Sequence, residues 1–335
     1  MSRTFIPEGY KSPMSLYETQ KAIEQTRQIF QQRLSQELHL MRVSAPLFVT
    51  RESGLNDDLN GVERAVGFDI PETGGEAQVV HSLAKWKRMA LKKYDIHVGK
   101  GLYTDMNAIR RDETLDNLHS VYVDQWDWEK TIADSDRTEA YLRATVTAIV
   151  NAICDTKDRV NEMFPALRGT LSREISFITT QELEDLYPDL TPKERENAYV
   201  KTHPTTFLMQ IGGVLRSGEK HDGRAPDYDD WQLNGDILFR NDVLGCAFEV
   251  SSMGIRVSPG SLDRQLTIAG CDARRALPFH KALLAGELPQ SIGGGIGQSR
   301  LCMLLLEKAH IGEVQVSVWD EDTLRICREN GIEIL

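Results

Sequence analysis

Two long stretches of the chain carry apolar residues at helical spacing. In residues 15–40 and again in residues 137–164, apolar positions recur at helical intervals, which predicts two long amphipathic helices. The first stripe consists of Leu16, Ile23, Phe30, Leu34 and Leu38, and the second of Leu142, Val146, Ile149, Val150 and Ile153. Further helices are expected over residues 82–94, 181–186 and 191–200.

Polar and apolar residues alternate over residues 121–128, which predicts a strand with Gln125 on one face and Asp124 and Trp126 on the other. Shorter strand-like runs are residues 78–80, 174–178, 206–211, 236–239 and 247–250. The run 40–49 also favours a strand, although Pro46 indicates an edge or a bulge. Helices gather early and strands late, without regular βαβ alternation. We therefore expect an α+β fold, with a mostly antiparallel sheet flanked by helices.

Composition sets the limits of this fold. The chain has 335 residues, enough for a sizeable core, and no Pro/Gly/Ser-rich linker divides it, so residues 1–335 are expected to form a single domain. The net charge of −11 argues against a broad nucleic-acid-binding surface. Five widely spaced cysteines indicate reduced thiols. With no long apolar run and no apolar leader, a cytoplasmic protein without a membrane partner is expected.

A glycine-rich run near the end of the chain, residues 291–301, is the strongest local signal of a ligand site. Gly293, Gly294, Gly295 and Gly297 precede Arg300 and an apolar segment. Glycine lets backbone approach a ligand, and arginine pairs with phosphate or stacks on a base. We interpret the run as a turn at a nucleotide site, although a tight turn before a core helix explains the glycines equally well. Neither a Walker loop nor a Rossmann fingerprint fits.

Carboxylates lie in segments expected to be buried. Asp127 lies near the end of the strand-like run 121–128 and needs a positive partner, either a ligand's amino group or an internal Lys or Arg. Asp236 and Glu249 lie on strands expected to be neighbours and could share Mg²⁺, with Arg256 as a further positive group for a polyphosphate. Two acids alone are a weak metal pattern.

Two further segments have the composition of a binding site. Ser82 can cap the helix 82–94, and three cations follow in its first two turns: Lys85, Lys87 and Arg88. Cations there oppose the helix dipole, so some of them are expected to bind an anion; a solvated basic face is the alternative.

Residues 221–231 form an acid-rich segment typical of loops that cover active sites, or of plain surface loops. No hydrolase or zinc-protease signature is present.

Together these segments resemble the catalytic core of class II aminoacyl-tRNA synthetases, and more closely the bacterial ammonia-dependent, AMP-forming asparagine synthetases, an aspartate–ammonia ligase family. The resemblance covers nearly the whole chain. Residues 43–48, with Pro46, are similar to motif 1, residues 109–113 to motif 2 and residues 293–300 to motif 3. The more specific runs are HSLAKWKR, GLYTDM, LHSVYVDQWDWE, RAPDYDDW, NGDIL, SSMGIRV and GGGIGQSRL.

The resemblance implies an ATP-dependent ligase. The β-carboxylate of L-aspartate would attack the α-phosphorus of ATP and release pyrophosphate; ammonia would then convert β-aspartyl-AMP to asparagine and AMP. ATP and Mg²⁺ are the implied co-substrate and cofactor, and motif 1 implies a homodimer. The alternative is an aspartate-activating tRNA synthetase-like paralogue, which would usually carry a separate anticodon-binding barrel and a basic face. Free ammonia is the implied nitrogen source, since Ser2 rather than cysteine follows Met1.

Matching positions imply the site residues. Arg110 would hold the α-phosphate, Arg300 the adenine and γ-phosphate region, and Asp57 would attract and help deprotonate ammonium. The aspartate site would comprise Asp57, Ser82, Lys87, Gln125, Asp127, Ser251 and Ser252, with Asp127 on the α-amino group and Lys87 on the α-carboxylate. The nucleotide site would comprise His81, Arg110, Asp229, Asp230, Asp236, Glu249, Arg256, Gly293, Gly294, Gly295 and Arg300, with Asp236 and Glu249 on Mg²⁺.

Overall fold

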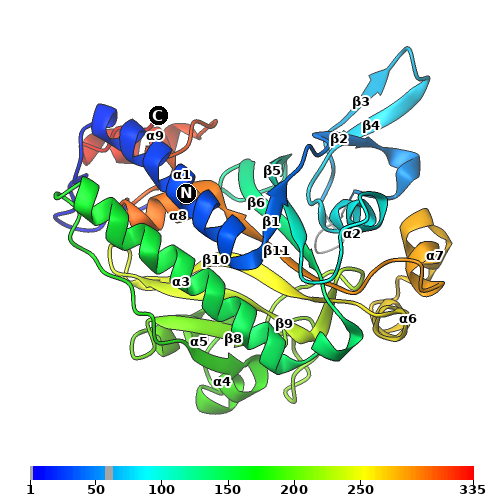
Figure 1. The fold of residues 1–335 in the computed structure, drawn as a ribbon. Coiled ribbons are helices and arrows are strands. Elements are labelled where there is room, and N and C mark those ends of the chain that lie inside the picture. Colours follow the sequence, from blue (N-terminus) through cyan, green and yellow to red (C-terminus); the bar gives the residue numbers. More distant parts are fainter. Residues whose placement is uncertain (1–2, 57–62) are drawn as a thin grey trace.

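A computed structural model describes residues 3–56 and 63–335 and is built around one large sheet (Figure 1). Its strands lie in the order β1 (Leu40–Arg42), β5 (Gly101–Ile109), β6 (Tyr122–Thr131), β11 (Ser291–Gly297), β10 (Cys246–Arg256), β9 (Asp229–Asn241), β8 (Thr205–Met209) and β7 (Ser176–Thr179). Among these strands, only the outermost pairs, β1 with β5 and β7 with β8, are parallel. The expected α+β fold with a mostly antiparallel sheet is confirmed.

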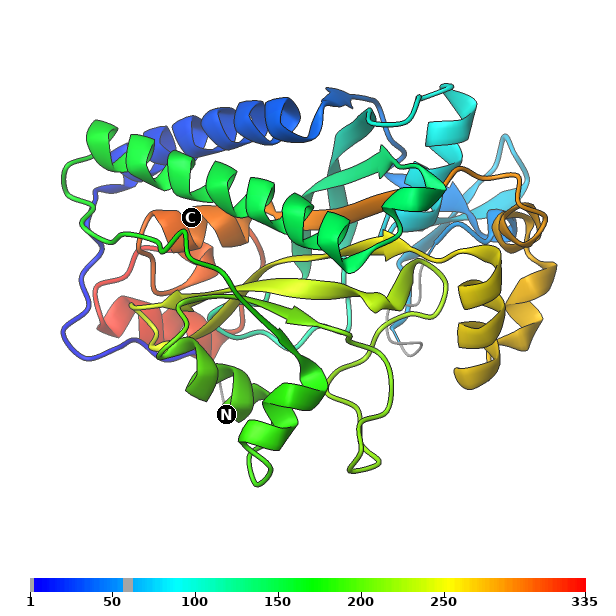
Figure 2. The ribbon, with the colours of Figure 1, turned by 60° about the horizontal axis from the view of Figure 1, so that its bottom comes forward.

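One face of this sheet is covered by two long helices. Helices α1 (Leu16–Leu38) and α3 (Glu139–Met163) run side by side across it, as Figures 1 and 2 show. Phe30 of α1 and Val146 of α3 share one core with Trp126 of β6. Both helices match the sequence expectation to within two residues at each end. The start of α1 is fixed by Ser15, whose hydroxyl accepts the Glu18 N–H in a capping box.

The opposite face is covered towards its two ends. Helix α2 (Ala84–Lys93) packs by β5, and helices α4 (Thr180–Leu186) and α5 (Pro192–Val200) pack by β7 to β9. Because side chains alternate along a strand, Leu208 and Leu238 contact α4 and α5 while Phe207 and Ile237 lie in the main core. The middle of this face, over β6, β11 and β10, carries polar side chains instead.

The remaining elements surround this frame. A small sheet of β2 (Phe48–Thr50), β4 (Gly75–Val79) and β3 (Gly67–Ile70) forms the projecting arm in Figure 1. The other helices are α6 (Pro259–Ile268), α7 (Pro278–Leu284), α8 (Gln298–Leu305) and α9 (Glu321–Glu329), with 3₁₀ turns η1 (Arg51–Ser53), η2 (Asp134–Asp136), η3 (Asp272–Ala276) and η4 (Ile311–Glu313). In the described part of the chain, no helix has the length and apolar character needed to cross a bilayer.

Three local expectations are corrected by the structure. The run 40–49 is not one strand: it divides around Pro46 into β1 and β2, which belong to different sheets, and β1 is an edge strand. The acid-rich segment 221–231 is a loop only up to Tyr228, because β9 begins at Asp229. The glycine-rich run is not a turn but β11, a central strand between β6 and β10.

The glycines of β11 have a packing role that the turn interpretation missed. A Cβ on Gly293 would overlap the carboxylate of Glu129, and one on Gly295 would overlap the amide of Gln125. Both neighbours are residues of β6 that reach across β11 on the open face of the sheet. Glycine at these positions therefore makes room for side chains of the adjacent strand.

Candidate active site

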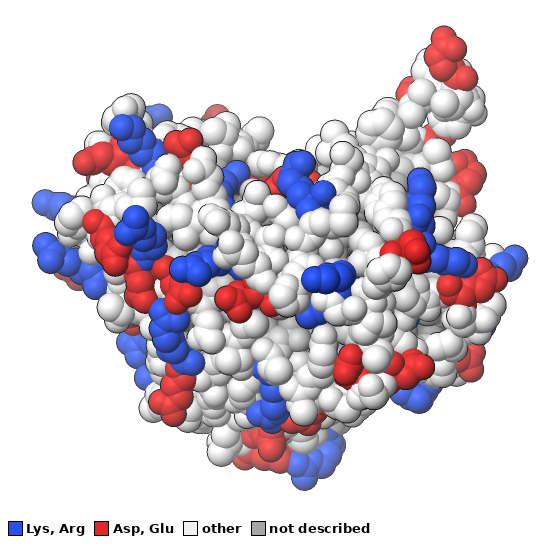
Figure 3. Space-filling view, viewed as in Figure 1, with Lys and Arg blue, Asp and Glu red and all other residues white. Residues whose placement is uncertain are grey.

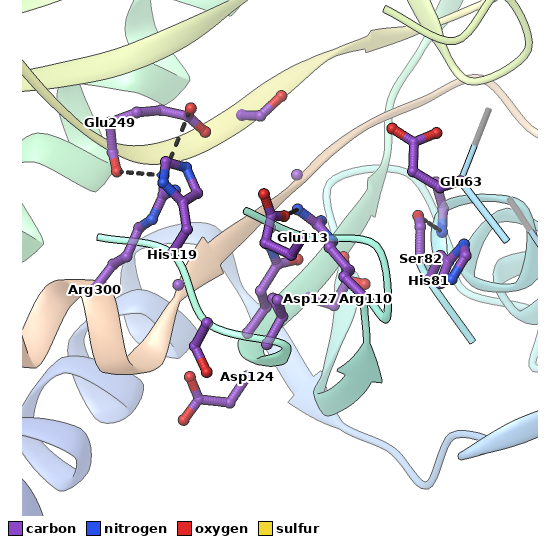
Figure 4. A pocket seen from close by; sticks show the side chains of 18 of the residues that line it. Glu63, His81, Ser82, Arg110, Glu113, His119, Asp124, Asp127, Glu249 and Arg300 are labelled. Atoms are coloured by element: carbon purple, nitrogen blue, oxygen red, sulfur yellow. Dashed lines mark hydrogen bonds and ion pairs between the residues drawn. The ribbon is translucent and has the colours of Figure 1, made fainter. Parts of the chain in front are cut away.

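A cavity of about 400 Å³ opens over the middle of the sheet (Figure 4). Its wall includes most of the residues predicted from the sequence: His81, Ser82, Lys87, Arg110, Gln125, Asp127, Asp229, Glu249, Ser252, Arg256, Gly294, Gly295 and Arg300. These residues come from α2, β5–β6, β9–β11 and the start of α8, so segments more than 200 residues apart in the chain meet here.

Four of the predicted residues that the structure describes are not on this wall. Ser251 and Gly293 adjoin wall residues along their strands, Asp236 bonds to Arg224 of the wall, and Asp230 bonds to Arg137. Asp57 lies outside the described residues.

Lys87 and Asp127 form a buried ion pair in the cavity wall. The Lys87 ammonium, only 1% exposed, donates to the Asp127 carboxylate and to the carbonyls of Trp128 and Gly294, both at 3.0 Å. Burial lowers the pKa of Lys87, while Asp127 and Glu129 act in the opposite direction. The internal partner that the sequence left open for Asp127 is thus Lys87. Both groups lie where a zwitterionic ligand could exchange partners with them.

Arg256 is held in a second buried network. Its Nε lies 3.0 Å from both carboxylate oxygens of Glu129, and its Nη1 donates to Asp229. Ser291 donates to Glu129 at 2.7 Å. Burial would raise the pKa of Glu129, but Arg256 and Lys87 together hold it below its usual value. Arg256 lines the cavity with its charge already compensated by two carboxylates.

Arg110 and Arg300 are held more loosely. Arg300 donates to the Glu249 carbonyl at 3.2 Å and lies 3.6 Å from its carboxylate; Arg110 lies 4.0 Å from the Glu113 carboxylate. The side chains of Arg110 and Arg300 are 27% and 23% exposed, against 3% for Arg256. Figure 4 shows Arg300 beside His119 and Arg110 beside Glu113, and both arginines are available to pair with an incoming anion.

Asp236 and Glu249 bring negative charge to the neighbouring strands β9 and β10. Burial, with the nearby Glu249 charge, raises the pKa of Asp236 to about 7 against the opposing effect of Arg224. The pKa of Glu249, which burial would raise, is held low by Arg300 and Lys193. Carboxylate oxygens are the ligands that Mg²⁺ takes in proteins, with water and phosphate oxygens completing its shell. Each of these two carboxylates lies beside an arginine, Asp236 beside Arg224 and Glu249 beside Arg300. No cluster of three or more His, Cys, Asp or Glu suited to a metal occurs among residues 3–56 and 63–335.

The cations of α2 have separate roles. Lys85 donates to the Asn56 carbonyl at 2.6 Å, and Arg88 to the carbonyls of Val257 and Pro289 at 2.6 and 3.0 Å. Of the three, Lys87 alone lines the cavity. The hydroxyl of Ser82 accepts the Ala84 N–H at 3.1 Å, although the N-cap position itself is Leu83.

Sequence reasoning assigned no role to several wall residues. Arg224 binds Ser252 and, at 2.6 Å, Asp236, and so ties the loop before β9 to the acid pair. Its position as a lone cation in the acid-rich segment was the available signal. Asp124, Ser299 and Gln315 also line the cavity and bond to one another. Their contact joins β6, α8 and the segment after η4, and no local pattern indicates it.

Comparison with known proteins gives matches over the full chain. A family model described as aspartate-ammonia ligase matches residues 17–331. A protein of Clostridium tetani named aspartate–ammonia ligase is 58% identical over 334 residues, covering 99% of this chain and 98% of its own. One of Ruminiclostridium cellulolyticum with the same name is 57% identical over 336 residues, covering 100% of both.

Solved structures share the fold at low identity. The asparaginyl-tRNA synthetase of Pyrococcus horikoshii complexed with asparaginyl-adenylate has a TM-score of 0.65 at 15% identity, over 90% of this chain and 68% of that one. The aspartyl-tRNA synthetase of Entamoeba histolytica has a TM-score of 0.63 at 15% identity, over 91% and 58%. This chain thus spans about two thirds or less of the length of those synthetases. The structural similarity confirms the class II synthetase fold.

Proposed function

The chain belongs to the aspartate–ammonia ligase family, and on that premise we propose that it converts L-aspartate, ammonia and ATP to L-asparagine, AMP and pyrophosphate through β-aspartyl-AMP. The observation that carries the proposal is the full-length identity of 57–58% to proteins of that name. The cavity supports it, because it combines two accessible arginines with a buried pair of opposite charges.

The pair Lys87–Asp127 is the proposed aspartate site. An amino acid brings an ammonium and a carboxylate group, and each can replace one member of the pair: the α-amino group bonds to Asp127 and the α-carboxylate to Lys87. Gln125 of β6 and Ser252 of β10, the strands on either side of β11, add neutral hydrogen-bonding groups. The exchange keeps the buried charges paired, so binding avoids the cost of an isolated charge.

Arg110 and Arg300 are proposed to hold ATP. The β-carboxylate of aspartate attacks the α-phosphorus, the bond to the β,γ-diphosphate breaks, and pyrophosphate leaves. The protein's task in this step is to align the reacting groups and neutralise charge at the phosphates, which two arginine forks can do. His81, Asp229, Asp230, Arg256 and the glycines of β11 are proposed to support the same nucleotide site.

Asp236 and Glu249 are the proposed ligands of Mg²⁺, whose chemistry here would be to neutralise and orient the phosphates of ATP. In the second step, ammonia attacks the activated carbonyl and AMP leaves. Asp57, Ser251 and Ser252 are proposed to complete the aspartate site. Asp57 is also proposed to accept the proton that ammonium must lose before attack.

Incubation with L-aspartate, ATP, Mg²⁺ and ammonium tests the proposal. We expect asparagine and AMP in equal amounts, neither formed without aspartate. ADP as the nucleotide product would contradict adenylate formation. Transfer of aspartate to tRNA without asparagine formation would favour the tRNA synthetase-like alternative.

We also propose that the chain forms a homodimer and acts in the cytoplasm. Pro46 lies between two short strands beside the exposed apolar side chains of Met41, Leu47 and Phe48, an area suited to contact a second copy. The five cysteines are unpaired, as expected of a reducing compartment.

A further inference from the structure

The start of helix α8, which carries Arg300, lacks a cap of its own. Its N-cap residue is Gly297, which has no side chain to accept the free N–H groups of the first turn. Asp124 of β6 supplies the missing acceptor from 175 positions away: its carboxylate accepts the Ser299 N–H at 3.0 Å and the Ser299 hydroxyl at 2.8 Å. Arg300 is the next residue, so this contact fixes the backbone from which its side chain extends.

The Asp124 carboxylate is itself oriented from the first helix. Arg27 of α1 donates to it at 2.7 Å through Nη2, and Gln315 donates at 3.3 Å through Nε2. Arg27 also lies 3.4 Å from the Ser299 hydroxyl. Arg27 does not line the cavity, whereas Asp124, Ser299 and Gln315 do. The first helix therefore contacts the cavity wall through this charged side chain.

The pairing also has an electrostatic consequence. Asp124 lies in the wall of a cavity that, by the function proposed above, receives the triphosphate of ATP. An uncompensated carboxylate there would repel the nucleotide, and in a partly buried site the repulsion is weakly screened. The guanidinium of Arg27 pairs with the Asp124 carboxylate, which is only 5% exposed, and so compensates its negative charge.

We propose that Arg27 and Asp124 act together as positioning residues for the nucleotide: Asp124 caps α8 and holds Arg300 in place, and Arg27 orients and neutralises Asp124. The inference rests on the proposed function, since it assigns the α8 end of the cavity to ATP. It concerns ATP binding and leaves the aspartate site, built on Lys87 and Asp127, unaffected.

The test compares four variants of the full chain: R27M, R27K, R27M/D124N and R33M. Arg33 lies on the same helix but is exposed, so R33M is the matched control for loss of an arginine from α1. Affinity for ATP with Mg²⁺ is measured by calorimetry, and KM for aspartate and kcat from asparagine formation. Circular dichroism checks that each variant is folded.

We expect R27M to bind ATP about tenfold more weakly, the size of one lost charge-assisted hydrogen bond, with KM for aspartate unchanged. R27K should stay within about threefold of wild type, because a second cation restores the charge without the fork. R27M/D124N should recover most of the ATP affinity, since an asparagine side chain on β6 is uncharged while its amide oxygen can still accept the Ser299 N–H. A general packing defect in α1 would not be rescued by a change on β6.

The inference is overturned if R27M and R33M bind ATP with equal affinity, or if R27M weakens ATP affinity and raises KM for aspartate by equal factors. It is also overturned if R27M/D124N binds ATP no more tightly than R27M. If R27M does not fold, D124A carries the test, because it removes the cap and keeps Arg27; unchanged ATP affinity in D124A overturns the inference. The proposed function fails separately, if wild-type protein forms no asparagine and AMP.

Discussion

At the scale of single residues, the glycines of β11 give the clearest link between sequence and site. Gly293 and Gly295 leave space on the open face of the sheet for Glu129 and Gln125 of β6. Glu129 in turn pairs with Arg256 and lies 3.8 Å from Lys87. A methyl group at Gly293 would therefore displace Glu129 and disturb its pairing with Arg256 and Lys87.

We expect Gly293→Ala to destabilise the protein by about 1–3 kcal/mol, as overpacking of a filled interior does, and to reduce asparagine formation strongly. Urea unfolding and the activity assay measure the two effects. Gly260→Ala is the control: a Cβ there, in α6, meets no atom within 4 Å, and alanine favours a helix. Equal stability of the two variants would contradict the role given to Gly293.

Asp57 gives a second prediction at this scale, which rests on the sequence alone. Asp57→Asn should keep aspartate-dependent exchange of pyrophosphate into ATP and lose asparagine formation, because only the second step needs a proton acceptor for ammonium. Asp58→Asn, the adjacent carboxylate, is the matched control and should retain both activities. If Asp57→Asn loses both, Asp57 is a substrate anchor.

At the scale of elements, His310 at the N-cap of η4 makes the free energy of unfolding depend on pH. His310 is buried and its Nδ1 accepts the Gly312 N–H at 3.0 Å. Burial lowers the pKa of His310 to about 4. The unfolded chain takes up this proton near pH 6.5, so between about pH 6.5 and 4 the unfolded state binds more protons than the folded state. The contribution of neutral His310 is complete above about pH 6.5 and is lost as the pH falls.

His310→Asn keeps an acceptor for the Gly312 N–H and removes the titration. Between about pH 7.5 and 5, the free energy of unfolding of wild type should fall by about 2 kcal/mol more than that of His310→Asn. Urea unfolding of both proteins at the two pH values gives this difference. A constant difference between them would show that His310 does not titrate as its burial indicates.

Element boundaries show where sequence patterns suffice. The helices α1 and α3 were predicted to within two residues at each end, because each has a long apolar stripe facing one core. The sequence patterns do not predict the strands β3 and β5, and they indicate a turn where β11 lies. A central strand made mainly of glycine has no alternation, and only its neighbours on both sides make it a strand.

At the scale of the whole molecule, the projecting arm and the edge of the large sheet leave apolar side chains exposed. Met41, Leu47, Phe48 and Phe68 are 38–56% exposed, and the Phe48 and Phe68 rings pack edge to face at 5.1 Å. On the face drawn in Figure 3, acidic and basic side chains are intermixed rather than gathered into one patch.

For the proposed homodimer we expect a solution mass twice the 37.8 kDa of one chain. Leu47→Arg should shift it towards the monomer, because a charge in an apolar contact remains unpaired. Ile268→Arg, a similarly exposed apolar position at the end of α6, should not. Sedimentation at several concentrations measures the mass; a wild-type monomer at all of them would contradict the dimer.

By itself the sequence determined the fold class, the two long helices, the family and thirteen of the residues of the cavity wall, because these depend on local periodicity and on short motifs. Tertiary structure decided which charges meet. Lys87 pairs with Asp127, Arg256 with Glu129, and Arg27 with Asp124 and through it with Ser299. Such pairs join residues 40 to 175 positions apart. They follow from strand order and from which face of the sheet each side chain occupies, and neither is encoded in the residues that flank a charge.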